Sequence, residues 1–278
     1  MKKFIVRTLA GALFAAVLIG AILYGWSSFT MLFLPITAFS LNELCMLLKK
    51  HRNATFSTPH AVICGMLLFS AFAALGYIEG VSPVLLFAPY IIAVMYVFIT
   101  RLFSPKVNAL EDYAYFALTQ LYVALPLSLL NLLASAGAAE DEAYYWLMPL
   151  SVFIFIWCND SGAFCVGCTI GRHKMFERVS PKKTWEGFAG GVVVAAAAGV
   201  VMSHFFAVLN VWEWVGMALV VAVAGTLGDL VESSMKREMQ IKDSGKFLPG
   251  HGGFLDRFDS TLLAVPAVVL YFALLGVL

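Results

Sequence analysis

Apolar runs of about the length of a bilayer-spanning helix recur along almost the whole chain, separated by short polar connections. A helix needs about 20 mostly apolar residues to cross the hydrocarbon core, so each run predicts one span. We predict nine spans, over residues 4–26, 30–48, 60–77, 84–100, 113–133, 144–157, 188–209, 214–230 and 260–277. The pattern therefore predicts an all-α, polytopic integral membrane protein.

The distribution of Lys and Arg predicts the orientation of these spans, because cations near span ends stay on the cytoplasmic side. With the N-terminus inside, every second connection should lie outside and lack cations. All 18 Lys and Arg residues fall on the other side, before the first span or after the second, fourth, sixth and eighth. We therefore expect a cytoplasmic N-terminus, an external C-terminus and a retained first span.

Composition supports the bilayer as the solvent of this chain. Apolar residues make up 61% of it and charged residues only 13%, which does not fit a soluble protein. No internal repeat and no Gly/Ser-rich linker is visible, so we expect one integral domain over residues 1–278. Within it, residues 1–140 are expected to be mainly scaffold helices. Residues 141–278 contain the two longest polar connections and should carry the chemistry.

The eighth span runs into a polar stripe. Asp229, Glu232, Ser233, Lys236 and Arg237 lie three and four residues apart, which places them along one side of a continuing helix. A carboxylate at membrane depth is costly and by default suggests function. The alternative is an interfacial Asp229 that is satisfied by Lys236 or Arg237.

A second polar segment follows, and it contains Pro249-Gly250-His251-Gly252-Gly253. These glycines permit backbone amides to approach an anionic group closely. Asp256 and Asp259 come next, at a spacing of three that lets both carboxylates point the same way. Paired carboxylates beside basic residues suit a magnesium–nucleotide site, since Mg²⁺ prefers oxygen ligands and phosphates prefer Lys and Arg.

Two stretches together resemble the phosphatidate cytidylyltransferase (CDP-diacylglycerol synthase) family. The first resembles its full signature and reads Ser233-x-Met235-Lys236-Arg237, Lys242-Asp243-x-Gly245, Leu248-Pro249-x-His251-Gly252-Gly253-Phe254-x-Asp256-Arg257-Phe258-Asp259. The second reads Asp160-Ser-Gly-Ala, Gly171-Arg172 and Ser180-Pro181-Lys182-Lys183-Thr184-x-Glu186-Gly187. The motifs cover the C-terminal part of the chain, and the remainder agrees by its span layout.

The resemblance implies a divalent-metal-dependent reaction in which CTP and phosphatidic acid give CDP-diacylglycerol and pyrophosphate, in phospholipid biosynthesis. By analogy with the family, Asp229 and Asp256 are the expected Mg²⁺ ligands, with Asp259 and Asp243 as further ligands or supporting groups; a second cation is an open alternative. The expected catalytic residues are Lys236, Arg237, Lys242, Asp243, His251 and Arg257. The expected nucleotide-binding residues are Asp160, Ser180, Lys182, Lys183, Thr184 and Glu186. Positive-inside anchoring is the alternative role for the basic residues.

Further expectations concern partners and location. We expect membrane lipids and the two substrates as partners and no nucleic acid, with a homodimer as an open alternative. The location implied is a bacterial-type inner membrane, with the active site on the cytoplasmic face. An ion-coupled transporter is the main rival, although the charges gather in cytoplasmic connections rather than near the midplane. A CDP-alcohol phosphotransferase would show an Asp-Gly-x-x-Ala-Arg motif, which is absent from the sequence.

Overall fold

The computed structural model describes residues 2–78, 80–103, 109–136, 144–245 and 252–278, with side chains from Ala10 onward. The chain forms two compact units. The first unit consists of Met1–Trp146 and Asp243–Arg257, and the second of Leu147–Lys242 and Phe258–Leu278.

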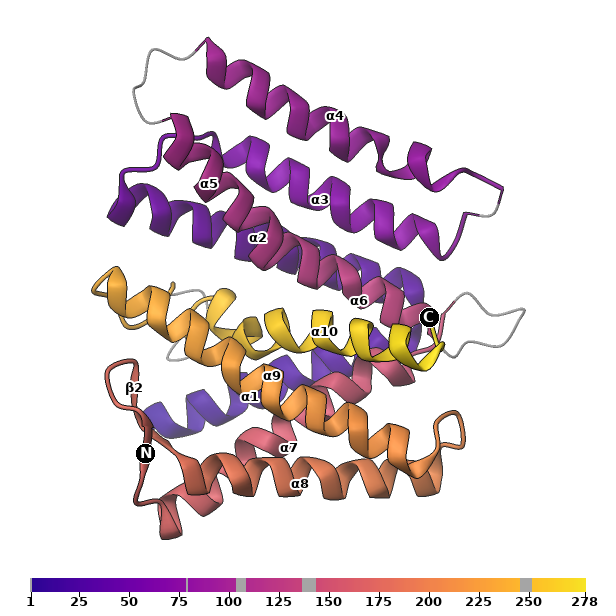
Figure 1. Ribbon diagram of the computed structural model, residues 1–278, viewed down its shortest axis with the longest axis vertical. Helices are drawn as coiled ribbons and strands as arrows, with labels where there is room; N and C mark the ends of the chain where they lie inside the picture. Colours follow the sequence, from indigo (N-terminus) through magenta and orange to yellow (C-terminus); the bar gives the residue numbers. More distant parts are fainter. Residues whose placement is uncertain (1, 79, 104–108, 137–143, 246–251) are drawn as a thin grey trace. The chain divides into compact units, whose positions relative to one another are not determined.

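The regular secondary structure in the described part of the first unit is helical. Its helices are α1 (Lys2–Tyr24), α2 (Trp26–Arg52), α3 (Thr58–Leu75), α4 (Pro83–Leu102), α5 (Ala109–Thr119) and α6 (Leu125–Ser135). A π-helical turn, Gln120–Ala124, joins α5 to α6 without a break. Figure 1 shows α2, α3 and α4 side by side, and α3 contacts both α2 and α4. Gly25, whose φ of 133° favours glycine, alone separates α1 from α2.

The second unit is built on three long helices that lie side by side in Figure 1, namely α7 (Leu147–Ile170), α8 (Trp185–Phe205) and α9 (Val211–Glu238). Helix α10 (Leu255–Leu275) begins in the first unit and continues from Phe258 in the second. Asn210 and Glu213 form a reciprocal cap at the start of α9, in which each side chain accepts a hydrogen bond from the other's backbone amide. This cap defines where α9 starts.

The all-α, polytopic prediction is confirmed. Within the described residues, eight helical stretches are long and apolar enough to cross a membrane, with α5, the π-helical turn and α6 together counting as one. Helix α1 adds a ninth apolar helix, of which Ala10–Tyr24 has described side chains. The orientation of the termini stays a prediction.

One predicted boundary is wrong, and one predicted continuation of a helix is confirmed. The sixth span was expected to end at residue 157, with Asp160 opening a polar connection, but α7 continues to Ile170. The residues after Asp160 are small or apolar and include no proline, so nothing in them ends a helix. The eighth span was expected to end at residue 230 with its helix continuing through the polar stripe. Helix α9 continues through Glu238, which confirms this expectation.

Small residues bring α7 and α8 close together. A Cβ on Gly191 would lie 2.6 Å from the backbone oxygen of Asn159, and a Cβ on Gly190 would overlap the side chain of Val166. Membrane helices commonly pack through such small residues, because lipid offers no hydrophobic drive for their association. Gly190 and Gly191 therefore permit the close contact between α7 and α8.

A short antiparallel hairpin follows α7, with strands β1 (Lys174–Phe176) and β2 (Ser180–Thr184). The sequence of Ser180 to Gly187 is typical of the capped start of a helix, but in the structure its first half forms β2 instead. Thr184 is the cap, and its hydroxyl accepts a hydrogen bond from the Gly187 amide at 3.1 Å. Lys182 and Lys183 accordingly lie in β2 rather than in the first turn of α8.

A buried ion pair in the first unit joins α4, α5 and the connection between α2 and α3. Arg101 near the end of α4 contacts the carboxylate of Asp112 in α5, which is 2% exposed. The same carboxylate accepts hydrogen bonds from the backbone and hydroxyl of Thr55, between α2 and α3. Arg101 also donates to the Thr55 hydroxyl at 2.7 Å. The cluster therefore ties the connections at one end of these helices together.

Replacing Arg101 by Ala should lower the free energy of unfolding by about 3 kcal/mol, because it leaves a buried carboxylate without its cation. Chemical or thermal unfolding of the purified protein in detergent would measure the change. Arg178→Ala, which removes an exposed arginine from the hairpin, is the matched control. Equal stability of the two variants would show that the Asp112 cluster contributes nothing.

Candidate active site

Three carboxylates of the second unit converge between α9 and α10. Asp229, Glu232 and Asp259 each offer one oxygen, and these oxygens lie within 4.8 Å of one another. The Glu232 residue is 0% exposed, whereas the Asp229 side chain keeps 34% of its surface. Like charges this close repel one another, so the cluster favours positively charged groups around it.

Glycine allows α10 to approach α9 at this cluster. A Cβ on Gly228 would lie 2.6 Å from the backbone oxygen of Asp259 and 3.2 Å from that of Ser260. Any larger residue would push the two backbones apart. Gly228 therefore decides that Asp259 reaches the carboxylates of α9.

Two lysines neutralise part of this charge. The Lys236 ammonium lies 2.5 Å from the Glu232 carboxylate, one helical turn along α9. The Lys183 ammonium, from β2, lies 2.7 Å from an Asp229 oxygen and donates to the backbone oxygen of Thr226 at 3.3 Å. The Ser233 hydroxyl donates to the other Asp229 oxygen at 3.2 Å. Among the described residues, two ammonium groups thus pair with this cluster of three carboxylates, so its described part carries more negative than positive charge.

The chemistry of this donor set fits a divalent cation. Carboxylate oxygens are the ligands that Mg²⁺ prefers, and three of them gather from two helices. Asp229 and Asp259 were expected as ligands, and they are brought together. Glu232 was seen in the polar stripe but not chosen as a ligand, although its spacing of three from Asp229 already placed it on the same side of the helix.

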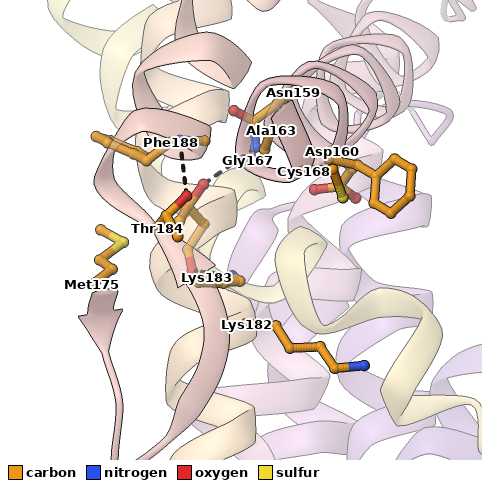
Figure 2. A pocket seen from close by; sticks show the side chains of 13 residues that line it. Asn159, Asp160, Ala163, Gly167, Cys168, Met175, Lys182, Lys183, Thr184 and Phe188 are labelled. Atoms are coloured by element: carbon orange, nitrogen blue, oxygen red, sulfur yellow. Dashed lines mark hydrogen bonds between the residues drawn. The ribbon is translucent and has the colours of Figure 1, made fainter. Parts of the chain in front are cut away.

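A cavity of about 290 Å³ lies beside Lys183 in the second unit. Figure 2 shows its wall, with Asn159 and Asp160 contributed by α7 and Lys182 and Lys183 by β2. Phe164, Phe188 and Met175 supply apolar surface. The Asn159 amide donates to the Thr226 hydroxyl at 3.2 Å, which links α7 to α9 at the cavity floor. Four of the predicted nucleotide-binding residues, Asp160, Lys182, Lys183 and Thr184, therefore share one cavity.

Thr184, Glu186 and Ser180 of the predicted nucleotide-binding set also make local contacts. Thr184 lines the cavity and also caps α8. The Glu186 carboxylate accepts hydrogen bonds from the amides of Arg172 and His173 and lies 2.5 Å from the His173 ring. Ser180 pairs with Phe176 across the hairpin. These contacts hold the segment that presents Lys182 and Lys183.

In the first unit, Asp256 organises the start of α10. One of its oxygens accepts hydrogen bonds from the amides of Ser244, at 2.9 Å, and Gly253, at 2.8 Å. Glu43 of α2 accepts a hydrogen bond from the Leu255 amide at 2.9 Å. The sequence interpretation missed Glu43, although a carboxylate inside an apolar span was a visible signal. Asp229 and Asp256 lie in different units, so their joint ligation of a cation stays a prediction.

The other predicted catalytic residues are scattered. Lys242, Asp243 and Arg257 are exposed. The Arg237 guanidinium donates to the backbone oxygens of Val179, at 3.3 Å, and Ile241, at 3.0 Å, and so fastens the hairpin to the end of α9. His251 lies outside the described residues.

Comparison with known proteins adds a family and named relatives. A family model described as "Cytidylyltransferase family" matches residues 5–275. A phosphatidate cytidylyltransferase of Staphylococcus aureus (strain COL) is 45% identical over 118 residues, which make up 42% of this chain and 45% of that protein. One of Staphylococcus haemolyticus (strain JCSC1435) is 41% identical over 130 residues, 46% of this chain and 49% of that protein. The chain spans about half the length of the curated relatives it matches.

Proposed function

Because the chain belongs to the cytidylyltransferase family, as its signature predicted, we propose that it transfers the cytidylyl group of CTP to phosphatidic acid. The products are CDP-diacylglycerol and pyrophosphate. The relatives' name, phosphatidate cytidylyltransferase, supports this choice of lipid substrate. The observation that carries the proposal is the carboxylate cluster of Asp229, Glu232 and Asp259 with Lys183 and Lys236 beside it. Membership of this family gives no support to the alternative function, that of an ion-coupled transporter.

The reaction requires charge neutralisation and positioning more than proton transfer. The nucleophile is a phosphate monoester oxygen, which is largely ionised at neutral pH because the second pKa of such a group is about 6. It attacks the α-phosphorus of CTP, a new P–O bond forms, and the bond to the bridging oxygen of the departing pyrophosphate breaks. No general base is needed. Two anions must instead be brought together and the leaving group stabilised.

The chain's own residues supply these functions in separate places. Asp229, Glu232 and Asp259 would hold Mg²⁺, which when bound withdraws charge from the phosphate oxygens. Lys183 and Lys182 would bind phosphate oxygens in the cavity that they line. Asn159 and the Thr226 hydroxyl offer polar contacts at the same wall. The apolar side chains of the cavity would shield the nucleotide from bulk water.

The expected surroundings follow from the same reaction. We propose that the site faces the cytoplasm in a bacterial-type inner membrane, where CTP is available and the cations of the predicted inner connections gather. Phosphatidic acid would come from the surrounding bilayer. No nucleic acid is expected as a partner, and a homodimer remains an alternative to the monomer.

A direct assay tests the function. The purified protein in detergent with phosphatidic acid, labelled CTP and Mg²⁺ should form labelled CDP-diacylglycerol and release one pyrophosphate for each turnover. Omission of phosphatidic acid or addition of a chelator should stop both. If a folded, lipid-supplied preparation releases no product, the proposal is wrong.

Replacing Lys183 by Met should lower kcat/KM for CTP about 100-fold, because a cation positioned in the cavity is lost. The side chain keeps its length, so packing against Thr226 should change little. Lys174→Met, in the exposed strand β1 of the same hairpin, is the control. Steady-state kinetics with varied CTP measures both variants. An effect of Lys183→Met no larger than that of the control would remove Lys183 from the site.

A further inference from the structure

Glu43 reaches from the middle of α2 to a segment more than 200 residues away in the sequence. Its neighbours Leu44 and Cys45 are buried, as expected in an apolar span, but its own carboxylate accepts the Leu255 amide at 2.9 Å. A Cβ on Gly245 or on Gly253 would overlap this same carboxylate. Glu43 therefore fills the space against both glycines, and these two positions must lack a side chain for it to do so.

Asp256 holds the same segment through its own carboxylate. Its oxygen accepts the Ser244 and Gly253 amides, so it bridges residues on both sides of 246–251. Gly252, between them, has a φ of 79°, which favours glycine. Together the two carboxylates accept hydrogen bonds from three backbone amides, those of Ser244, Gly253 and Leu255. These bonds bring the two ends of the segment together.

Glu43 and Asp256 differ in what they touch. Asp256 belongs to the signature, and the family resemblance makes it an expected Mg²⁺ ligand. Glu43 contacts the backbone just before Asp256 in sequence, at Gly253 and Leu255. It also lines a cavity of about 660 Å³ together with Lys49, Lys50 and Phe254. Phe254 stacks on Phe39 of α2, with 5.1 Å between the ring centroids. This is a second contact that holds the stretch from Gly253 to Leu255.

We propose that Glu43 is a positioning residue for the cytidylyl transfer, since it holds the backbone from Gly253 to Leu255 and thereby orients the Asp256 carboxylate. This inference rests on the proposed function. Groups that orient a metal-binding carboxylate commonly change metal affinity or activity about 10- to 100-fold when removed. Glu43 acts through its shape and its acceptor oxygen, and does not itself touch the substrate.

Two substitutions separate shape from charge. Glu43→Ala removes the acceptor and the filled space, and should lower kcat about 10- to 100-fold and raise the half-saturating Mg²⁺ concentration. Glu43→Gln keeps a carbonyl oxygen of the same reach and should stay within about 3-fold of the wild type on the same reasoning. An equal loss in both variants would mean that the charge is required, which would overturn a positioning role.

Hydrogen–deuterium exchange of the same variants measures how firmly this backbone segment is held, and it does not require catalytic turnover. The amides of Ser244, Gly253 and Leu255 should exchange at least about 10-fold faster in Glu43→Ala than in the wild type, with α9 unchanged. Unchanged exchange would contradict the proposal. If the wild type makes no CDP-diacylglycerol, the proposed function fails, while the exchange data still decide whether Glu43 holds this segment.

Gly253→Ala provides a test that does not depend on the stability of Glu43→Ala. Its new Cβ must displace the Glu43 carboxylate, so it should reproduce the loss of activity and the faster exchange. In the Glu43→Ala background the same change should add little, because nothing remains to be displaced. Additive losses in the double variant would show that the two positions act independently and would refute the contact as the cause.

Discussion

Formation of CDP-diacylglycerol should fall at least about 1000-fold when Asp229 is replaced by Asn, the largest effect expected for a single change in α9. The Asp229 side chain is 34% exposed, against 1% for that of Glu232, and it contacts both Lys183 and Ser233. Loss of several kcal/mol of charge stabilisation corresponds to about this factor, at 1.36 kcal/mol for each tenfold change in rate.

The Asn side chain keeps the volume of Asp229 and an oxygen that can accept from Ser233, so folding should be preserved. Steady-state turnover and the binding of Mn²⁺, as a spectroscopic substitute for Mg²⁺, would be measured together. Glu238→Gln, an exposed carboxylate in the last turn of the same helix, is the control. If Asp229→Asn retains wild-type Mn²⁺ binding, the carboxylate cluster is not the cation site.

Replacing Asp256 by Asn should abolish turnover to a similar degree, about 1000-fold, while leaving the fold of the first unit intact. The remaining carbonyl oxygen can still accept the Ser244 and Gly253 amides, which hold the segment in place. What is lost is the negative charge. Asp256→Ala removes the acceptor as well, so it should also accelerate amide exchange at Ser244 and Gly253.

The comparison of Asp256→Asn with Asp256→Ala identifies the role of the carboxylate. Inactivity of both variants, with normal exchange only in Asp256→Asn, supports a charge-dependent function beyond loop structure. Near-normal activity in Asp256→Asn would mean that Asp256 only accepts hydrogen bonds from the backbone. Its assignment as a Mg²⁺ ligand would then be wrong. Glu177→Gln, in the exposed turn of the hairpin, controls for the loss of one acidic group.

Much of the fold could be predicted because the bilayer imposes a simple length rule on apolar runs. Eight helical stretches of the expected kind are confirmed among the described residues. An error occurred where polarity was taken as the end of a helix. Asp160 lies inside α7, because backbone hydrogen bonding continues through a polar residue as long as no breaker intervenes. The continuation of α9 through the polar stripe was predicted correctly. The hairpin at 174–184 went unnoticed because its strands are too short to show alternation.

The residue types of the candidate site could be predicted from the sequence, but not which distant residues contact one another. Spacing along one helix placed Asp229 near Glu232, and the signature indicated Asp259. Nothing in the sequence links Lys183 to Asp229, since they are 46 positions apart and meet only because the hairpin returns to α9. Glu43 is a clearer case, because its partners Gly253 and Leu255 lie at the far end of the chain.

By itself the sequence determined the solvent of this protein, its helical class and the residue types of its chemistry, because these depend on composition, run length and local spacing. The tertiary structure decided which charges face one another. Gly228 brings Asp259 against α9, β2 delivers Lys183 to Asp229, and Glu43 closes on Gly245 and Gly253. Each of these contacts depends on the approach of distant segments to within a few ångströms, which the local pattern of a sequence does not encode.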